Sequence, residues 1–73
     1  MMPEKYICHG EEITPGTVIE TENLETFAIS LIGSNTVYAV RLDSPIAALD
    51  ITKTKAQFRK WFRENGCTVV PTT

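Results

Sequence analysis

The sequence of 73 residues lacks long hydrophobic runs. The longest apolar stretch, residues 27–32, is interrupted by Ser30 and is far shorter than the roughly 20 residues that a membrane-spanning helix needs. The opening residues, MMPEKY, also lack the basic and apolar regions of a secretory signal peptide. We therefore expect a cytoplasmic protein that does not associate with membranes.

Cysteine and histidine are scarce, which argues against a disulfide scaffold and against a metal protein. Cys8 and Cys67 lie near opposite ends of the sequence, and one bridge is sparse for a secreted mini-protein, so reduced, partly buried thiols are favoured over a disulfide. A zinc site of Cys8, His9 and Cys67 would lack a fourth ligand and the paired C-x-x-C spacing of such sites. We expect neither a metal nor another cofactor.

Catalytic motifs are also missing. His9 stands near Glu11 and Glu12, but no serine or cysteine nucleophile is tied to it by spacing. The segment LIGSN contains a single glycine and does not form a phosphate-binding loop. These observations predict a non-enzymatic protein.

Charge is unevenly distributed along the chain, although the net charge is only −2. Residues 1–30 carry six acids and one base, whereas residues 31–73 carry three acids and six bases. Such segregation influences partner choice and encounter rate. We therefore expect the charged residues of both halves to bind a protein partner: Glu20, Glu22, Glu25, Arg41, Arg59, Lys60 and Arg63.

Runs of β-branched and aromatic residues predict a sheet within one domain that spans residues 1–73, with residues 1–4 and 71–73 frayed. Pro15 and Gly16 mark a turn, and residues 33–35 form a hairpin loop. The predicted strands are residues 5–9, 17–21, 22–32, 36–42 and 67–70.

One helix is predicted over residues 52–66. Thr54 and Gln57 match a capping box, and Gly66 suits the left-handed position that follows a helix. A shorter helical turn is expected within residues 43–50, where Ser44 would be the N-cap and Pro45 the first helical residue.

The helix has two distinct faces. Phe58, Trp61 and Phe62 recur at i, i+3 and i+4, so they are expected to pack against the sheet. The bases follow a neighbouring stripe: Lys55, Arg59, Arg63 and, just beyond it, Lys60. This stripe is either a solvated face or a surface that meets phosphates, but the acidic pI of about 5.2 makes tight nucleic-acid binding unfavourable.

These elements predict an α+β fold, with a four- to five-stranded, mainly antiparallel meander and one amphipathic helix packed on one face. The predicted core contains Ile7, Val18, Ile19, Phe27, Ile29, Leu31, Tyr38, Val40, Leu42, Phe58, Trp61, Phe62 and Val69.

In length and style the chain resembles the small proteins with which phages take over host machinery, such as the transcription regulator of a lytic Xanthomonas phage that binds host RNA polymerase. The resemblance implies a phage-encoded protein of the host cytoplasm that inhibits or regulates host transcription by occluding a polymerase surface, and it carries over no individual residue. Anti-CRISPR proteins, which inhibit another host complex, are similar in size and style. A weak nucleic-acid-binding regulator that uses the basic helix face is a further alternative.

Overall fold

The β-branched and aromatic stretches form an antiparallel sheet of five strands in the computed structural model, which describes residues 6–44 and 50–71. The strand order is β6-β5-β4-β3-β7, so β3 to β6 form a meander and β7 joins the edge beside β3. The bounds are β3 (Val18–Glu20), β4 (Thr26–Ile32), β5 (Thr36–Arg41), β6 (Ile51–Thr54) and β7 (Thr68–Val70).

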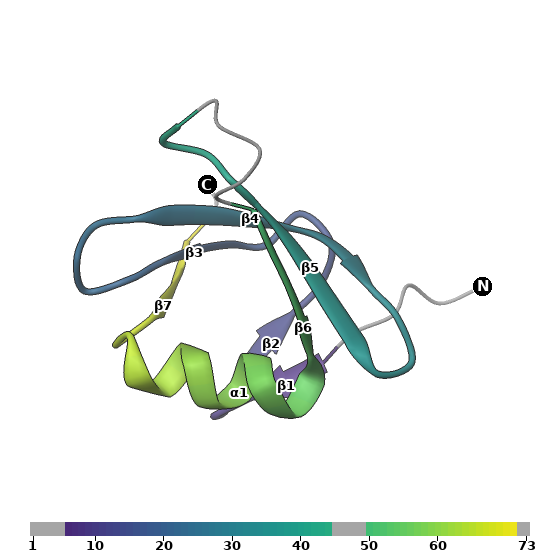
Figure 1. Cartoon of the computed structure of the whole chain (residues 1–73). Helices are drawn as coiled ribbons and strands as arrows, with labels where there is room; N and C mark the ends of the chain where they lie inside the picture. Colours follow the sequence, from purple (N-terminus) through teal and green to yellow (C-terminus); the bar gives the residue numbers. More distant parts are fainter. Residues whose placement is uncertain (1–5, 45–49, 72–73) are drawn as a thin grey trace.

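The other elements of the described residues are a two-stranded hairpin of β1 (Tyr6–Cys8) and β2 (Glu11–Ile13) and one helix, α1 (Lys55–Glu64). Figure 1 shows α1 and the hairpin on the same side of the larger sheet. The Tyr6 hydroxyl donates a hydrogen bond of 2.8 Å to the Lys55 carbonyl, which ties the hairpin to the start of the helix. The predicted α+β class, with an antiparallel meander and one helix, is confirmed.

The signals that delimit the helix are confirmed, but its first residues were predicted wrongly. Thr54 Oγ1 accepts a hydrogen bond of 3.1 Å from the Gln57 amide, and Gln57 Oε1 accepts one of 3.0 Å from the Thr54 amide. Gly66 has a φ of +58°, the left-handed conformation expected after the helix. The helix begins at Lys55 rather than at residue 52, because residues 51–54 pair with β5 as an edge strand.

The predicted inward residues of β4 and β5 were partly wrong, and in β4 the cause is a bulge between Ile29 and Leu31. An extra residue in one strand reverses the faces that follow it. Ile32 is therefore buried, whereas the predicted core residue Leu31 is 60% exposed. On β5 the smaller side chains of Val37 and Ala39 face the core, and the predicted Tyr38 and Val40 are only partly buried.

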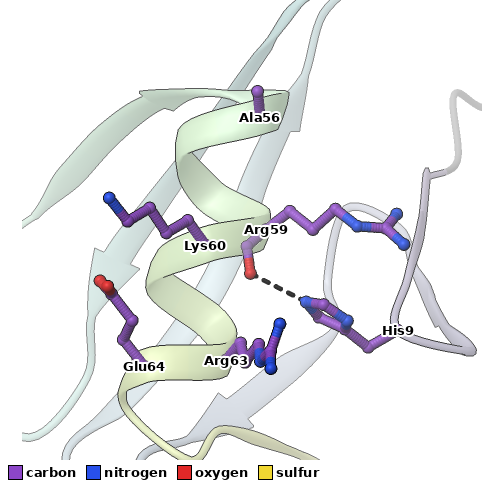
Figure 2. A pocket seen from close by; sticks show the side chains of 6 residues that line it. All are labelled: His9, Ala56, Arg59, Lys60, Arg63 and Glu64. Carbon is purple, nitrogen blue, oxygen red and sulfur yellow. Dashed lines mark hydrogen bonds between the residues drawn. The ribbon is translucent and has the colours of Figure 1, made fainter.

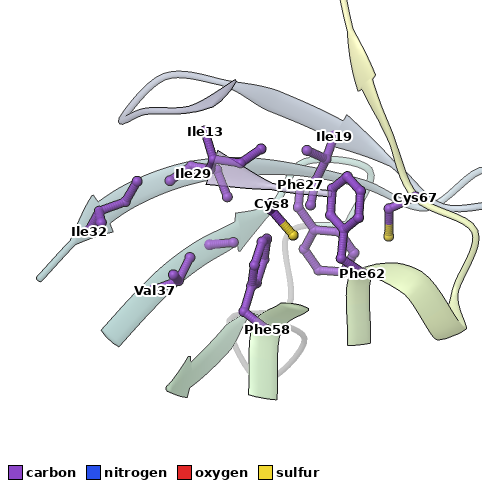
Figure 3. Close-up of a cluster of buried hydrophobic side chains, with 11 residues drawn as sticks. Cys8, Ile13, Ile19, Phe27, Ile29, Ile32, Val37, Phe58, Phe62 and Cys67 are labelled. Carbon is purple, nitrogen blue, oxygen red and sulfur yellow. The ribbon is translucent and has the colours of Figure 1, made fainter. Parts of the chain in front are cut away.

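The core lies between the sheet, the hairpin and the helix (Figure 3). Two further predicted core residues, Ile7 and Leu42, are more than half exposed. Val18, Trp61 and Val69 are partly buried. Six buried hydrophobic side chains were absent from the predicted core: Cys8, Ile13, Ile32, Val37, Ala39 and Cys67. Five predicted ones are confirmed as buried: Ile19, Phe27, Ile29, Phe58 and Phe62.

The short strand β2 was not predicted, because two of its three residues are glutamates and its single apolar residue, Ile13, gives no visible alternation. The helical turn predicted with Pro45 as its first residue falls on residues 45–49, which lie outside the described residues. The described residues next to it show a bend at residues 42–43 and no regular structure at Ser44.

Candidate functional site

The turn between β1 and β2 places the single histidine against the helix. Cys8 pairs with Glu11 across a two-residue turn, in which His9 and Gly10 have φ values of +50° and +84°. Two consecutive positive φ values are typical of the type I′ hairpin turn. His9 therefore does not extend β1, as the predicted strand over residues 5–9 required.

His9 is attached to α1 at two points. Its Nε2 donates a hydrogen bond to the Arg59 carbonyl oxygen over 3.0 Å, and its ring stacks on Phe62 with centroids 6.2 Å apart. The carbonyl can only accept, so Nε2 carries a proton. The hairpin turn and the helix thus form the two walls of one surface feature.

Between these walls lies a groove of about 530 Å³. Its helical wall consists of residues at i, i+3, i+4, i+7 and i+8, which share one face of a helix. Figure 2 shows this face with His9 opposite Arg59 and Arg63. The groove is lined by His9, Ala56, Arg59, Lys60, Arg63 and Glu64, and we call it the basic groove.

The three bases of the basic groove have no acidic partner within the described residues. Both ion pairs found there involve Arg41, and no described carboxylate lies within 4.0 Å of the charged groups of Arg59, Lys60 or Arg63. All three side chains are exposed. The groove therefore presents positive charge that is not neutralised locally, with Glu64 as its single acid.

Two of the predicted partner-binding residues, Glu25 and Arg41, bind each other. Arg41 Nη1 lies 3.4 Å from Glu25 Oε2, and its guanidinium also donates hydrogen bonds to both oxygens of Asp43. The guanidinium stands over the ring of Phe27, 5.4 Å from its centroid. The hydrogen bond from Arg41 lowers the pKa of Asp43 below its usual value. Arg41 therefore holds β5 and the adjacent loop together.

The remaining acids of the predicted set, Glu20 and Glu22, lie on β3 and just after it. Glu20 lies on β3 between Thr26 of β4 and Thr68 of β7, and it is partly buried. Glu22 lies beside the end of the helix, where its amide donates to the Asn65 carbonyl over 2.9 Å. Neither Glu20 nor Glu22 lines the basic groove.

Both cysteines are buried, and the pKa of each thiol is raised. Both are free thiols, and Cys8 is fully inaccessible while Cys67 is 9% exposed. Burial raises the pKa of the Cys8 thiol, and burial with the nearby Cys8, Glu25 and Glu22 raises the pKa of Cys67 to about 11. Within the described residues, which include Cys8, His9 and Cys67, no three metal-binding side chains come together.

The raised pKa of Cys67 predicts a loss of stability in alkali. The folded state holds the thiol proton up to about pH 11, whereas an unfolded thiol releases it near 9.0. The stabilisation is complete below the unfolded pKa and is lost as pH rises through the folded one, at a cost of about 2 kcal/mol.

Urea unfolding from about pH 8 to about pH 11 measures this loss, with Cys67→Ala as the control because it retains the other titrating groups. The wild type is expected to lose more free energy of unfolding than Cys67→Ala over this range. Parallel pH profiles for the two proteins would contradict the assignment to Cys67.

Comparison with known proteins adds no functional assignment. No protein-family model matches the chain, and neither a curated protein nor a solved structure matches it. In the described part of the chain, no helix is long and apolar enough to cross a membrane.

Proposed function

We propose that the chain is a small non-enzymatic binding protein that occludes an acidic surface of a larger host protein, with the basic groove as its contact surface. The observation that carries the proposal is that Arg59, Lys60 and Arg63 line one groove without an acidic partner among the described residues. Charges of this kind accelerate encounter and set orientation. Glu25 and Arg41, which neutralise each other, then contribute to the fold rather than to binding.

A protein partner is favoured over a nucleic acid by the amount of charge available. Proteins that hold DNA tightly neutralise about 6–10 phosphates, and each contact contributes to the salt dependence of binding. The basic groove offers three bases and one acid on a chain with a net charge of −2. Three bases are enough for a local contact with carboxylates, whereas the net negative charge of the chain would repel an extended phosphate backbone.

Bacterial RNA polymerase is the partner that we propose to test first, because the chain resembles small phage proteins in length and style. Purified polymerase is immobilised and titrated with the wild-type chain at low salt. The wild type is expected to bind, and to inhibit transcription at the same concentrations. A folded wild type that binds none of a panel of bacterial polymerases would overturn polymerase as the partner.

The contact surface is tested with the variant Arg59→Gln, Lys60→Gln, Arg63→Gln, in which glutamine retains the helix propensity and part of each stem. Its matched control, Glu20→Gln with Glu22→Gln, removes acids outside the groove. The groove variant is expected to associate about tenfold more slowly or worse, because electrostatic attraction acts chiefly on association rate. Circular dichroism checks both folds. Equal association rates for the groove variant and the wild type would exclude the groove as the contact surface.

The alternative of a nucleic-acid-binding regulator has its own test. A mobility shift at about 50 mM salt, where phosphate contacts are strongest, uses duplex and single-stranded probes. Saturable binding that is lost in the groove variant, together with no binding to polymerase, would favour this alternative. An inhibitor of a CRISPR complex would instead bind that purified complex through the same groove.

A further inference from the structure

The shape of the basic groove indicates what kind of partner segment it accepts. Ala56, Lys60 and Glu64 form one i+4 row along α1, and Arg59 and Arg63 form the adjacent row. Rows of this type are the ridges between which the side chains of a second helix pack. The small side chain of Ala56 leaves space at one end of the groove, and most of the lining is apolar because the stems of the bases form it.

We propose that the groove accepts an acidic amphipathic helix of the partner, which lies along α1 with its apolar side chains over Ala56 and its carboxylates near Arg59, Lys60 and Arg63. This inference rests on the proposed function and specifies the class of partner segment. Residues 56–64 span about 12 Å along the helix axis, so roughly two turns of the partner helix are in contact.

The backbone of the groove argues against an extended peptide. Extended segments bind by adding hydrogen bonds to exposed backbone groups, as in strand addition at a sheet edge. The interior amides and carbonyls of a helix are bonded to one another, and the Arg59 carbonyl also accepts from His9. Recognition in the groove therefore depends on side chains, which a helix presents at the same i, i+3 and i+4 spacing.

The aromatic residues argue against a single-stranded nucleic acid. Proteins that bind single strands stack bases on exposed aromatic faces along a basic channel. The single aromatic ring among the lining residues is that of His9, and it is stacked on Phe62. The groove thus combines positive charge with aliphatic stems, which suits leucine and glutamate side chains better than bases.

The experiment titrates the isotope-labelled chain with three capped peptides of about 20 residues, a length sufficient for stable helical turns. The first carries leucines at helical spacing flanked by glutamates. The second has lysines in place of the glutamates. The third has the composition of the first in an order that leaves no apolar face. Amide chemical shifts report both affinity and location.

Only the first peptide is expected to bind well, with the largest shifts at His9, Ala56, Lys60 and Arg63. The third is expected to bind at least about tenfold more weakly, a difference of about 1.4 kcal/mol. Equal binding of the first and third peptides would show that the groove attracts negative charge without recognising an amphipathic helix, and would overturn the proposal. Tighter binding of a single-stranded oligonucleotide at the same salt, or shifts located away from α1, would also overturn the proposal.

Two matched variants test the location of the contact. Ala56→Glu places a longer, acidic side chain in the groove, and Gln57→Glu places the same charge one residue away, outside its lining. Both acids stand in the first helical turn, where negative charge favours the helix, and Gln57→Glu preserves the capping box. Ala56→Glu is expected to weaken binding of the acidic helix about tenfold and Gln57→Glu about twofold or less.

The outcomes separate this proposal from the one on which it rests. Binding of polymerase through the groove, with no binding of the acidic helix, would overturn the helical partner segment and leave the proposed function intact. Binding of the acidic helix without binding of any polymerase would support the groove assignment and overturn polymerase as the partner. Equal affinity of Ala56→Glu and Gln57→Glu for the acidic helix would show that it does not lie along α1.

Discussion

Replacing Phe58 with alanine is expected to lower the free energy of unfolding by about 3–5 kcal/mol. Phe58 is fully buried, and its ring lies 6.3 Å from Tyr6, 5.6 Å from Trp61 and 5.9 Å from Phe62 between ring centroids. It therefore connects the hairpin to the helix. Domains of this size have total stabilities near the lower end of about 5–15 kcal/mol, so much of the Phe58→Ala protein is expected to be unfolded.

Urea unfolding followed by circular dichroism measures the effect, and Phe58→Leu is its control because leucine refills most of the space. That variant is expected to cost about 1 kcal/mol. Trp61→Ala should cost less than Phe58→Ala, since Trp61 is only partly buried and packs at the margin of the core. A cooperative transition of Phe58→Ala near that of the wild type would contradict the packing of the helix.

The second large effect is expected for Thr21→Val, which keeps the shape of a buried side chain and removes its hydroxyl. Thr21 is 2% exposed, and its Oγ1 accepts hydrogen bonds from the amides of Asn23 and Glu25, each at 3.2 Å. The same hydroxyl donates to Glu25 Oε1. Valine leaves two amides without this acceptor, so the loss of stability is expected to be about 2–3 kcal/mol.

Thr21→Ser is the control, since serine retains the hydroxyl and loses a methyl group, at a cost of about 1 kcal/mol. Hydrogen exchange supplies a local readout, because the amides of Asn23 and Glu25 should exchange faster in Thr21→Val than in Thr21→Ser. Unchanged exchange at both amides would show that the hydroxyl does not organise the loop between β3 and β4.

Features set by local chemistry could be predicted from the sequence. The capping box of Thr54 and Gln57, the left-handed Gly66 and the hairpin loop at residues 33–35 involve neighbouring residues only, and each is found where the pattern placed it. The inward face of β5 was not accessible in this way. It is set by the register with β4, in which Ile29 pairs with Ala39, and the larger Tyr38 and Val40 masked the inward Val37 and Ala39.

The candidate site could be predicted from the sequence only in part, because some of its contacts join residues that are far apart along the chain. The stripe of Arg59, Lys60 and Arg63 follows from helical spacing. The position of His9 required a turn with two positive φ values and a contact with a helix 50 residues further along the chain. The Glu25–Arg41 pair depends on the register that sets Phe27 opposite Arg41, which no local pattern reveals.

The pairing of β3 with β7 has a consequence for how the protein is made. Val18 pairs with Val70, so one edge of β3 has no strand partner until the ribosome has added roughly 50 further residues, at about 5–20 residues per second. An unpaired strand edge can join another chain. The nascent protein thus passes several seconds with β3 open to such contacts, and slower translation of residues 55–70 would prolong its exposure to aggregation and to chaperones.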